Sequence, residues 1–272
     1  MAPPVSAGAI RKLLIEIAAS GRRDDVLVVG GASELAPVLR QQFLRGRAEP
    51  GAVQLGGPEG ADVYVHVVAG ELRDEDVAVL RRASRAHVPV IAVAVDFADE
   101  ATIPYVFATD VVWVGVGKAF PLEAIARAVA RRLGEHSAPL AGRVPLLREA
   151  VTEQLVAGLS RRNGLVAVAV WIPGADRPIL ALNELRLVLR LAQAQGAARE
   201  VRDLLPELAA TLGAGFGLRA LTRELLDRVP EAAWALRCTI AYGGTRALGE
   251  AARMRFARAL TQPPGGAARA GP

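Results

Sequence analysis

The chain has 272 residues, of which 52% are hydrophobic and 22% charged, so it is long enough for two modest domains with apolar cores. Its net charge of +5 comes almost wholly from arginine in an alanine-rich chain, a bias typical of GC-rich genomes, and without an aromatic–basic reader motif it does not indicate nucleic acid. The single cysteine, Cys238, excludes an intramolecular disulfide, and neither it nor the three histidines show metal-ligand spacing.

The first half of the chain alternates between helical and strand patterns. Residues 6–20 show helical spacing that ends at Gly21, and residues 25–29 form a valine-rich run broken by Gly30 and Gly31. The same rhythm continues with an edge strand at 53–55, strands at 63–68, 88–95 and 111–116, and helices at 74–86 and 121–133. Continuous apolar strands alternating with helices predict an α/β fold with a mainly parallel sheet covered on both faces.

The second half of the chain is predicted to be helical. Gly, His, Ser and Pro in residues 135–144 suggest a linker, and five helical patterns follow at 145–171, 178–195, 201–212, 218–229 and 231–260. The run from Gly164 to Val170 is compatible with either a helix or a buried strand. The predicted units are an N-terminal helix (1–22), an α/β domain (23–134), the linker (135–144), an all-α helical domain (145–260) and a disordered tail (261–272).

Three glycines interrupt the last helical pattern. Gly243, Gly244 and Gly249 each cost about 1 kcal/mol relative to alanine, so close packing against a neighbouring helix is the expected compensation. The N-terminus lacks the features of a signal peptide, and the longest charge-free stretch of the second half is far short of a membrane span. The expected location is therefore the cytoplasm, either free or attached to a membrane.

The turn after residues 25–29 is the first candidate site. A strand that ends in glycines and leads into a helix favours anion binding, and the segment from Gly30 has the length of a phosphate-binding loop. Such a loop reads Gly, four residues, Gly-Lys and then Ser or Thr, but those last three positions hold Leu35, Ala36 and Pro37. They offer no ammonium group for a phosphate and no hydroxyl for magnesium, and Glu34 adds negative charge. We therefore interpret Gly30-Gly31 as a simple turn with Ser33 as the N-cap of the next helix.

In layout, residues 25–133 resemble the Era-like GTPases, with ADVYVHVV at 61–68 and VPVIAVAVD at 88–96 in the places of two of their strands. The functional motifs of that family are missing. Residues 55–60 contain no Asp-x-x-Gly motif, and Asp96 stands near the guanine-reading position without its Asn and Lys. The resemblance implies a sheet of P-loop GTPase type whose vestigial nucleotide pocket consists of Gly30, Gly31, Ser33 and Asp96. It implies no catalytic residue, metal or cofactor.

The second half resembles a domain of unknown function (family 697) that accompanies such GTPase domains and occurs in YcjF-type bacterial inner-membrane proteins. The resemblance covers about residues 145–258 and is carried by IPGADRP (172–178), Gln195-Gly196, Leu212-Gly213, Val229-Pro230 and AYGGTRALG (241–249). It implies a helical, often membrane-associated module and no chemistry.

The remaining polar residues are assigned structural roles. His66 is expected to be a satisfied core or edge residue, and residues 74–76 are expected to stabilise a helix dipole rather than act as acids or bases. A basic face that could dock on anionic lipid is formed in sequence by Arg127, Arg131, Arg132, Arg161 and Arg162, with a solvated surface as the alternative.

Three hypotheses follow. The leading one is a non-catalytic pseudo-GTPase adaptor or scaffold that docks on a protein partner, which would be a GTPase-domain protein or a second copy, or on the inner face of a membrane. The second is an unconventional nucleotide-binding switch or weak GTPase that uses Gly30, Gly31 and Asp96. The third is a small integral membrane protein, to which Arg237 and Arg246 would be costly.

Overall fold

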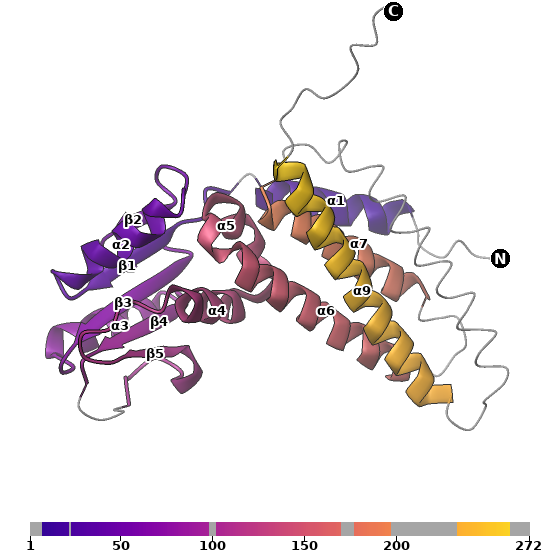
Figure 1. Cartoon of the computed structure of the whole chain (residues 1–272). Helices are drawn as coiled ribbons and strands as arrows, with labels where there is room; N and C mark the ends of the chain where they lie inside the picture. The colour runs from indigo at the N-terminus through magenta and orange to yellow at the C-terminus, as the bar shows by residue number, and fades with distance from the viewer. Residues whose placement is uncertain (1–6, 22, 98–101, 170–176, 197–232, 262–272) are drawn as a thin grey trace, which may run out of the picture.

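The computed structural model describes residues 7–21, 23–97, 102–169, 177–196 and 233–261. Its α/β unit contains a five-stranded, wholly parallel sheet in the order β2-β1-β3-β4-β5 (Figure 1). The strands are β1 (Leu27–Gly31), β2 (Val53–Leu55), β3 (Val63–Ala69), β4 (Val90–Val95) and β5 (Val111–Val114). The predicted α/β class and parallel sheet are confirmed, and the short strand at residues 53–55 lies at an edge as expected.

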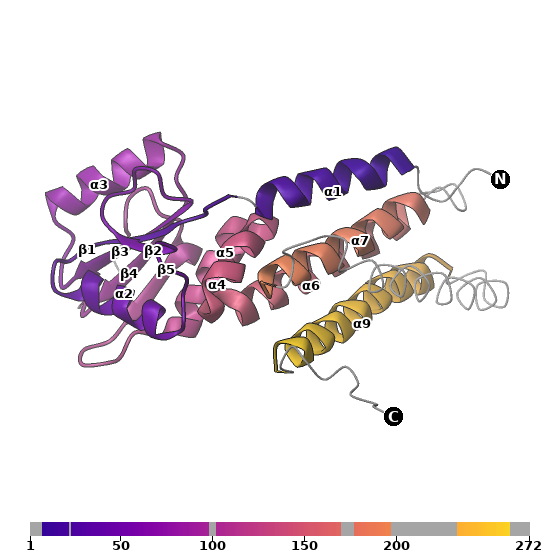
Figure 2. The same cartoon turned by 90° about the horizontal axis from the view of Figure 1, so that it is seen from above.

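Helices cover both faces of the sheet because side chains alternate between faces along each strand. Val29, Val65 and Val93 lie in the core with α2 (Leu35–Arg45) and α4 (Leu122–Leu133). The intervening side chains, such as Tyr64 and Ala92, pack with α3 (Asp74–Arg85) on the opposite face. Figure 2 shows α3 on one side of the sheet and α2 and α4 on the other.

The rest of the described chain forms a helical region that extends from one end of the sheet (Figures 1 and 2). It consists of α1 (Ala7–Gly21), α5 (Ser137–Arg143), α6 (Arg148–Ala169), α7 (Arg177–Ala194) and α9 (Ala233–Thr261), with short 3-10 turns at Gly134–His136 and Pro145–Leu147. The ambiguous run that begins at Gly164 is helical as far as Ala169. The predicted helices at 201–212 and 218–229 and the tail from residue 262 lie outside the described residues, as do 172–176, 212–213 and 229–230 of the family-697 resemblance.

The predicted linker is wrong. Residues 137–143 form α5, and the side chains of Ala138, Leu140 and Ala141 are fully buried. One apolar core runs from the sheet face under α4 through α5 to α6 and α7. Gly, Ser and Pro suggested a flexible connection, but small side chains also allow a short helix to pack closely between two larger layers. The sheet and the helical region therefore share one core.

The N-terminal helix belongs to the helical region rather than forming a separate unit. It lies along α7, so the chain begins among the helices, passes through the sheet and returns (Figure 2). The expectation of close packing holds for Gly249, where an added Cβ would lie 2.6 Å from Val156, but not for Gly243, which faces open space. Among the helices of the described residues, none has an apolar stretch long enough to cross a bilayer.

Candidate functional site

The carboxyl ends of β1 and β3 are the place where a sheet of this order usually binds a ligand. The chain leaves β1 toward β2 on one side, whereas β3 lies on the other, and such a switch point leaves a crevice at the strand ends. Gly30 and Gly31 end β1 there, as the sequence predicted. Their positions in the structure explain why both residues are glycine.

At both glycines a side chain would collide with the protein itself. A Cβ on Gly31 would overlap the carbonyl oxygen of Val67 on β3, and the φ of +98° at Gly31 is one that other residues rarely adopt. A Cβ on Gly30 would overlap the hydroxyl group of Tyr64 and the carbonyl oxygen of Gly56. The two glycines thus admit protein atoms to the space next to the strand end.

Backbone hydrogen bonds already occupy three amides of the loop that follows. The Ala32 amide donates to the Val67 carbonyl at 2.8 Å, and the Leu35 and Ala36 amides both donate to the Ala32 carbonyl, at 3.1 and 2.9 Å. A phosphate-binding loop needs such N–H groups to point at the anion. In this chain these three point at carbonyl oxygens.

The predicted N-cap is wrong. The helix begins at Leu35, and Glu34 rather than Ser33 occupies the cap position, without a side-chain hydrogen bond to the backbone. The exposed Ser33 lies one residue before the cap position. The amides of Leu35 and Ala36 donate to the Ala32 carbonyl instead of to a serine side chain. Glu34 puts a carboxylate at the helix end where a nucleotide phosphate would have to approach.

Asp96 lies at the same end of the sheet but apart from the glycines. It directly follows β4, is exposed, has a φ of +59° and donates its amide to the Val114 carbonyl at 3.0 Å. Because β3 lies between β1 and β4, Asp96 and Gly31 are separated by two strand spacings, about 10 Å. The structure thus brings Gly30, Gly31 and Ser33 together and leaves Asp96 at a distance.

A buried polar chain, which sequence reasoning did not predict as a unit, fills the α3 face beside Gly30. The Tyr64 hydroxyl lies 3.1 Å from Nδ1 of His66, whose Nε2 lies 2.9 Å from an Asp76 carboxylate oxygen. The other Asp76 oxygen accepts the Arg73 amide at 3.1 Å, at the start of α3. The expected positions of these residues are confirmed, since His66 is buried with partners on both ring nitrogens and residues 74–76 form the first turn of α3.

Burial sets the charge states of this chain. It raises the pKa of Tyr64 to about 12, with a smaller contribution from Glu59, so the hydroxyl stays protonated at neutral pH and can donate to His66. Burial also lowers the pKa of His66, although Asp76 opposes that shift. A neutral His66 that donates to Asp76 and accepts from Tyr64 satisfies all three groups. With Tyr64 and His66 both 1% exposed, the arrangement ties β3 to α3 rather than presenting a reactive group.

The arginines predicted as a basic docking face do not form one unpaired surface. Four of the five have acidic partners: Arg127 pairs with Glu123 at 3.3 Å, Arg131 and Arg132 both face the buried Asp110, and Arg162 pairs with Glu135 at 3.4 Å. Arg161 is exposed on α6. The sequence could not reveal these pairs, because most of the partners lie on other elements.

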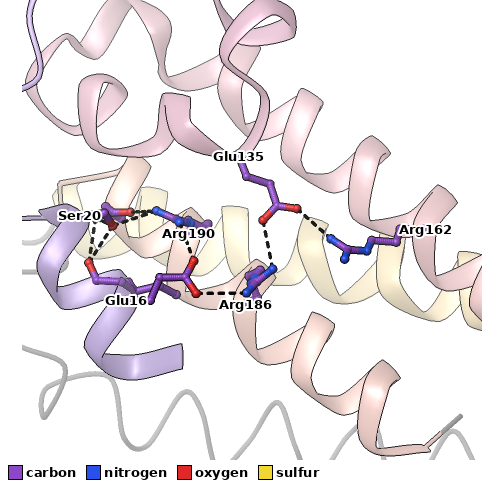
Figure 3. A network of polar contacts seen from close by, with 8 residues as sticks. Glu16, Ser20, Glu135, Arg162, Arg186 and Arg190 are labelled. Atoms are coloured by element: carbon purple, nitrogen blue, oxygen red, sulfur yellow. Dashed lines mark hydrogen bonds and ion pairs between the residues drawn. The ribbon is translucent and has the colours of Figure 1, made fainter. Parts of the chain in front are cut away.

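A second polar network joins α1 to the helical region (Figure 3). The guanidinium of Arg190, 2% exposed, donates to Ser20 at 2.9 Å and contacts Glu16 at 3.4 Å, and burial lowers its pKa. Arg186 bridges Glu16 and Glu135, and Glu135 also contacts Arg162. These partners are up to 174 residues apart in sequence, so no local sequence pattern could have predicted the contacts.

Comparisons of the chain with protein-family models, with curated proteins and with solved structures found no match. Within the described residues, no group of three or more His, Cys, Asp or Glu side chains is placed to hold a metal ion. Function must therefore be argued from the geometry at the strand ends.

Proposed function

We propose that this protein is a non-catalytic adaptor, a pseudo-GTPase whose α/β unit derives from the P-loop type and is joined to a helical region of the family-697 type. The observation that carries the proposal is the closed loop after β1, in which the Ala32, Leu35 and Ala36 amides are bound to carbonyl oxygens. A nucleotide would have to break these hydrogen bonds before its phosphates could gain new ones.

The charges at the loop after β1 also oppose nucleotide binding. Glu34 stands at the N-cap of α2, and Ala36 occupies the position where an active loop carries lysine. Two like charges about 4 Å apart repel by about 4 kcal/mol near a protein surface. Triphosphate binding would therefore meet repulsion at the point where active loops supply attraction.

The shared core supports an adaptor role. Because α5 is buried between α4 and the longer helices, the α/β unit and the helical region form a fixed arrangement rather than two units on a flexible tether. A rigid molecule with two different ends can hold one partner in a set orientation to another. The partner class that we propose is a GTPase-domain protein or a second copy of this chain, with an anionic membrane surface as the alternative.

Titration with fluorescent GTP and ATP in the presence of magnesium tests the proposal. We expect no saturable binding up to about 1 mM, a weak limit that corresponds to about 4 kcal/mol. Micromolar binding that Asp96→Ala abolishes would overturn the adaptor proposal and favour the nucleotide switch.

The exposed position of Glu34 supplies a matched pair of variants. Glu34→Gln removes the negative charge and Glu34→Lys adds an ammonium group, yet neither disturbs the three backbone hydrogen bonds. If the occupied amides dominate, both variants still fail to bind nucleotide. Substitution of Gly31 is not informative here, because any side chain would collide with Val67 and disrupt the fold itself.

A further inference from the structure

The outer edge of β5 is an unprotected strand edge. Among the described residues β4 is the one strand that pairs with β5, and Figure 1 shows β5 at the margin of the sheet opposite β2. Residues 111–116 read VVWVGV and contain no charge or proline, the usual devices that keep an edge from pairing with another chain. An edge of this composition favours addition of another strand.

The hydrogen-bonding groups that face outward can be assigned from the pairing with β4. The Val114 carbonyl accepts the Asp96 amide, so Val114 faces β4. Because backbone groups alternate between the two sides of a strand, Trp113 presents its N–H and C=O to the outside. Val111 and Gly115 face the same way. The Val111 N–H and the Gly115 C=O are already used in turns with Ala108 and Lys118, which leaves the Val111 C=O and the Gly115 N–H.

This pattern of groups is complementary to itself. When two such edges run antiparallel about a two-fold axis at Trp113, the two Trp113 residues exchange both of their hydrogen bonds. The same register sets the Val111 carbonyl of each copy opposite the Gly115 amide of the other. Four hydrogen bonds then form between the two copies. The Val111 N–H and the Gly115 C=O, which are already bonded within turns, take no part in them.

The side chains at the two ends of β5 also match under this symmetry. Phe107, 62% exposed, precedes the strand and Val116, 79% exposed, follows it, so an antiparallel pair brings each Phe107 near the Val116 of the other copy. Arg131 and Arg132 lie at the Phe107 end, where Arg132 stacks on Phe107 at 4.7 Å, and both are partly neutralised by Asp110. The 90% exposed Glu123 lies near the other end, at the start of α4, where the partner's arginines would meet it.

From these observations we infer that a second copy of this chain pairs with the first through β5, giving a continuous ten-stranded sheet across a two-fold axis. The helical region extends from the end of the sheet where β1 begins, so antiparallel pairing directs the two helical regions away from each other (Figure 2). The inference names the self-association surface of the proposed adaptor and rests on that proposal for its biological role. Its geometry, however, does not depend on whether the chain binds nucleotide.

Sedimentation equilibrium of the full chain tests the pairing. The expected result is a concentration-dependent dimer of twice the 28.6 kDa chain mass. Gly115→Pro removes the outward N–H and should shift the protein to the monomer mass, since proline is tolerated at strand edges where no donor is needed within the fold. Gly115→Ala keeps the N–H, and its Cβ would meet only Lys118 at 3.7 Å, so this control should remain dimeric.

A second variant covers the case in which Gly115→Pro fails to fold. Val116→Arg places a positive charge on a highly exposed side chain, at the end where Arg131 and Arg132 of the other copy would lie, and should weaken dimerisation at least tenfold without changing the thermal unfolding of the monomer. A wild-type chain that stays monomeric at all concentrations would overturn the inference, and so would a dimer that neither Gly115→Pro nor Val116→Arg weakens. Nucleotide titration is a separate measurement, so failure of the pairing and failure of the adaptor proposal are distinguishable.

Discussion

The two regions of this molecule are specified by different kinds of contact. In the α/β unit, apolar side chains from β1, β3, β4 and β5 cover both faces of the sheet, and the critical positions are glycines to which other protein atoms approach closely. In the helical region, buried polar side chains join different helices: Asn163 links α6 to α7 and α9, and Arg190 links α7 to α1. Both regions nevertheless share one apolar core.

The difference shows what each region can tolerate. Apolar cores accept volume-conserving changes but not added atoms at a backbone contact, whereas a buried polar network loses stability whenever one member is left without a partner. Substitutions chosen in each region therefore test the comparison.

The largest loss is expected for Gly31→Ala in the α/β unit. The added Cβ would overlap backbone atoms of Val67, which cannot move without breaking the β1–β3 pairing, so the free energy of unfolding should fall by about 4 kcal/mol or more. Urea denaturation measures it. Gly51→Ala is the matched control, because Gly51 also has a positive φ, +82°, but open space around it, and should lose about 1 kcal/mol. Equal losses would show that backbone contact is not the cause.

Asn163→Leu tests the helical region. Asn163 is fully buried, donates to Thr245 at 2.8 Å and accepts from Asn183 at 2.7 Å, so its loss leaves two buried groups without this partner. The expected decrease in unfolding free energy is about 2–3 kcal/mol. The double variant Asn163→Leu/Asn183→Leu should lose less than the sum of the two single variants, because the removed groups depend on each other. Simple additivity would contradict a coupled network.

Asp25→Asn probes the junction between α1 and β1, and here a gain is expected. Burial, with a smaller contribution from Asp62, raises the pKa of Asp25 from 3.8 to about 6. The folded state therefore holds this proton more tightly than the unfolded state, and the resulting stabilisation, complete below pH 3.8, is lost as pH rises through 6. At pH 8 the asparagine variant should be more stable than the wild type by about 1–2 kcal/mol.

The same variant should show no gain near pH 3, where the Asp25 carboxyl is neutral in both states. Thermal unfolding at a series of pH values provides the comparison. A gain of equal size at every pH would mean that the buried charge is not its source.

The smallest effect is expected for Arg127→Ala on α4. Its ion pair with Glu123 joins two side chains that are 60% and 90% exposed, so less than about 0.5 kcal/mol should be lost. Arg132→Ala on the same helix should cost more, because Arg132 stacks on Phe107 and faces the buried Asp110. Calorimetric unfolding of the two variants would rank them, and the reverse order would contradict the assignment.

Sequence reasoning succeeded where a local pattern decides the structure. Valine-rich runs predicted β1, β3, β4 and β5, because a strand covered on both faces is apolar at nearly every position, whereas β2 is a short edge strand with Gln54 and Leu55 exposed. It failed at residues 135–144, where small residues suggested a linker but form the buried α5, and at Ser33, where a backbone carbonyl replaced the expected side-chain cap. The partners of Arg190 and His66 come from other elements, so those contacts required coordinates.

The central claim is that the loop after β1 is closed to phosphate because its amides are already bonded. Hydrogen exchange at the Ala32, Leu35 and Ala36 amides, measured with and without magnesium GTP, tests this claim most directly. The account predicts amides that are protected in the free protein and unchanged by nucleotide. Fast exchange in the free protein, followed by protection when GTP is added, would contradict it.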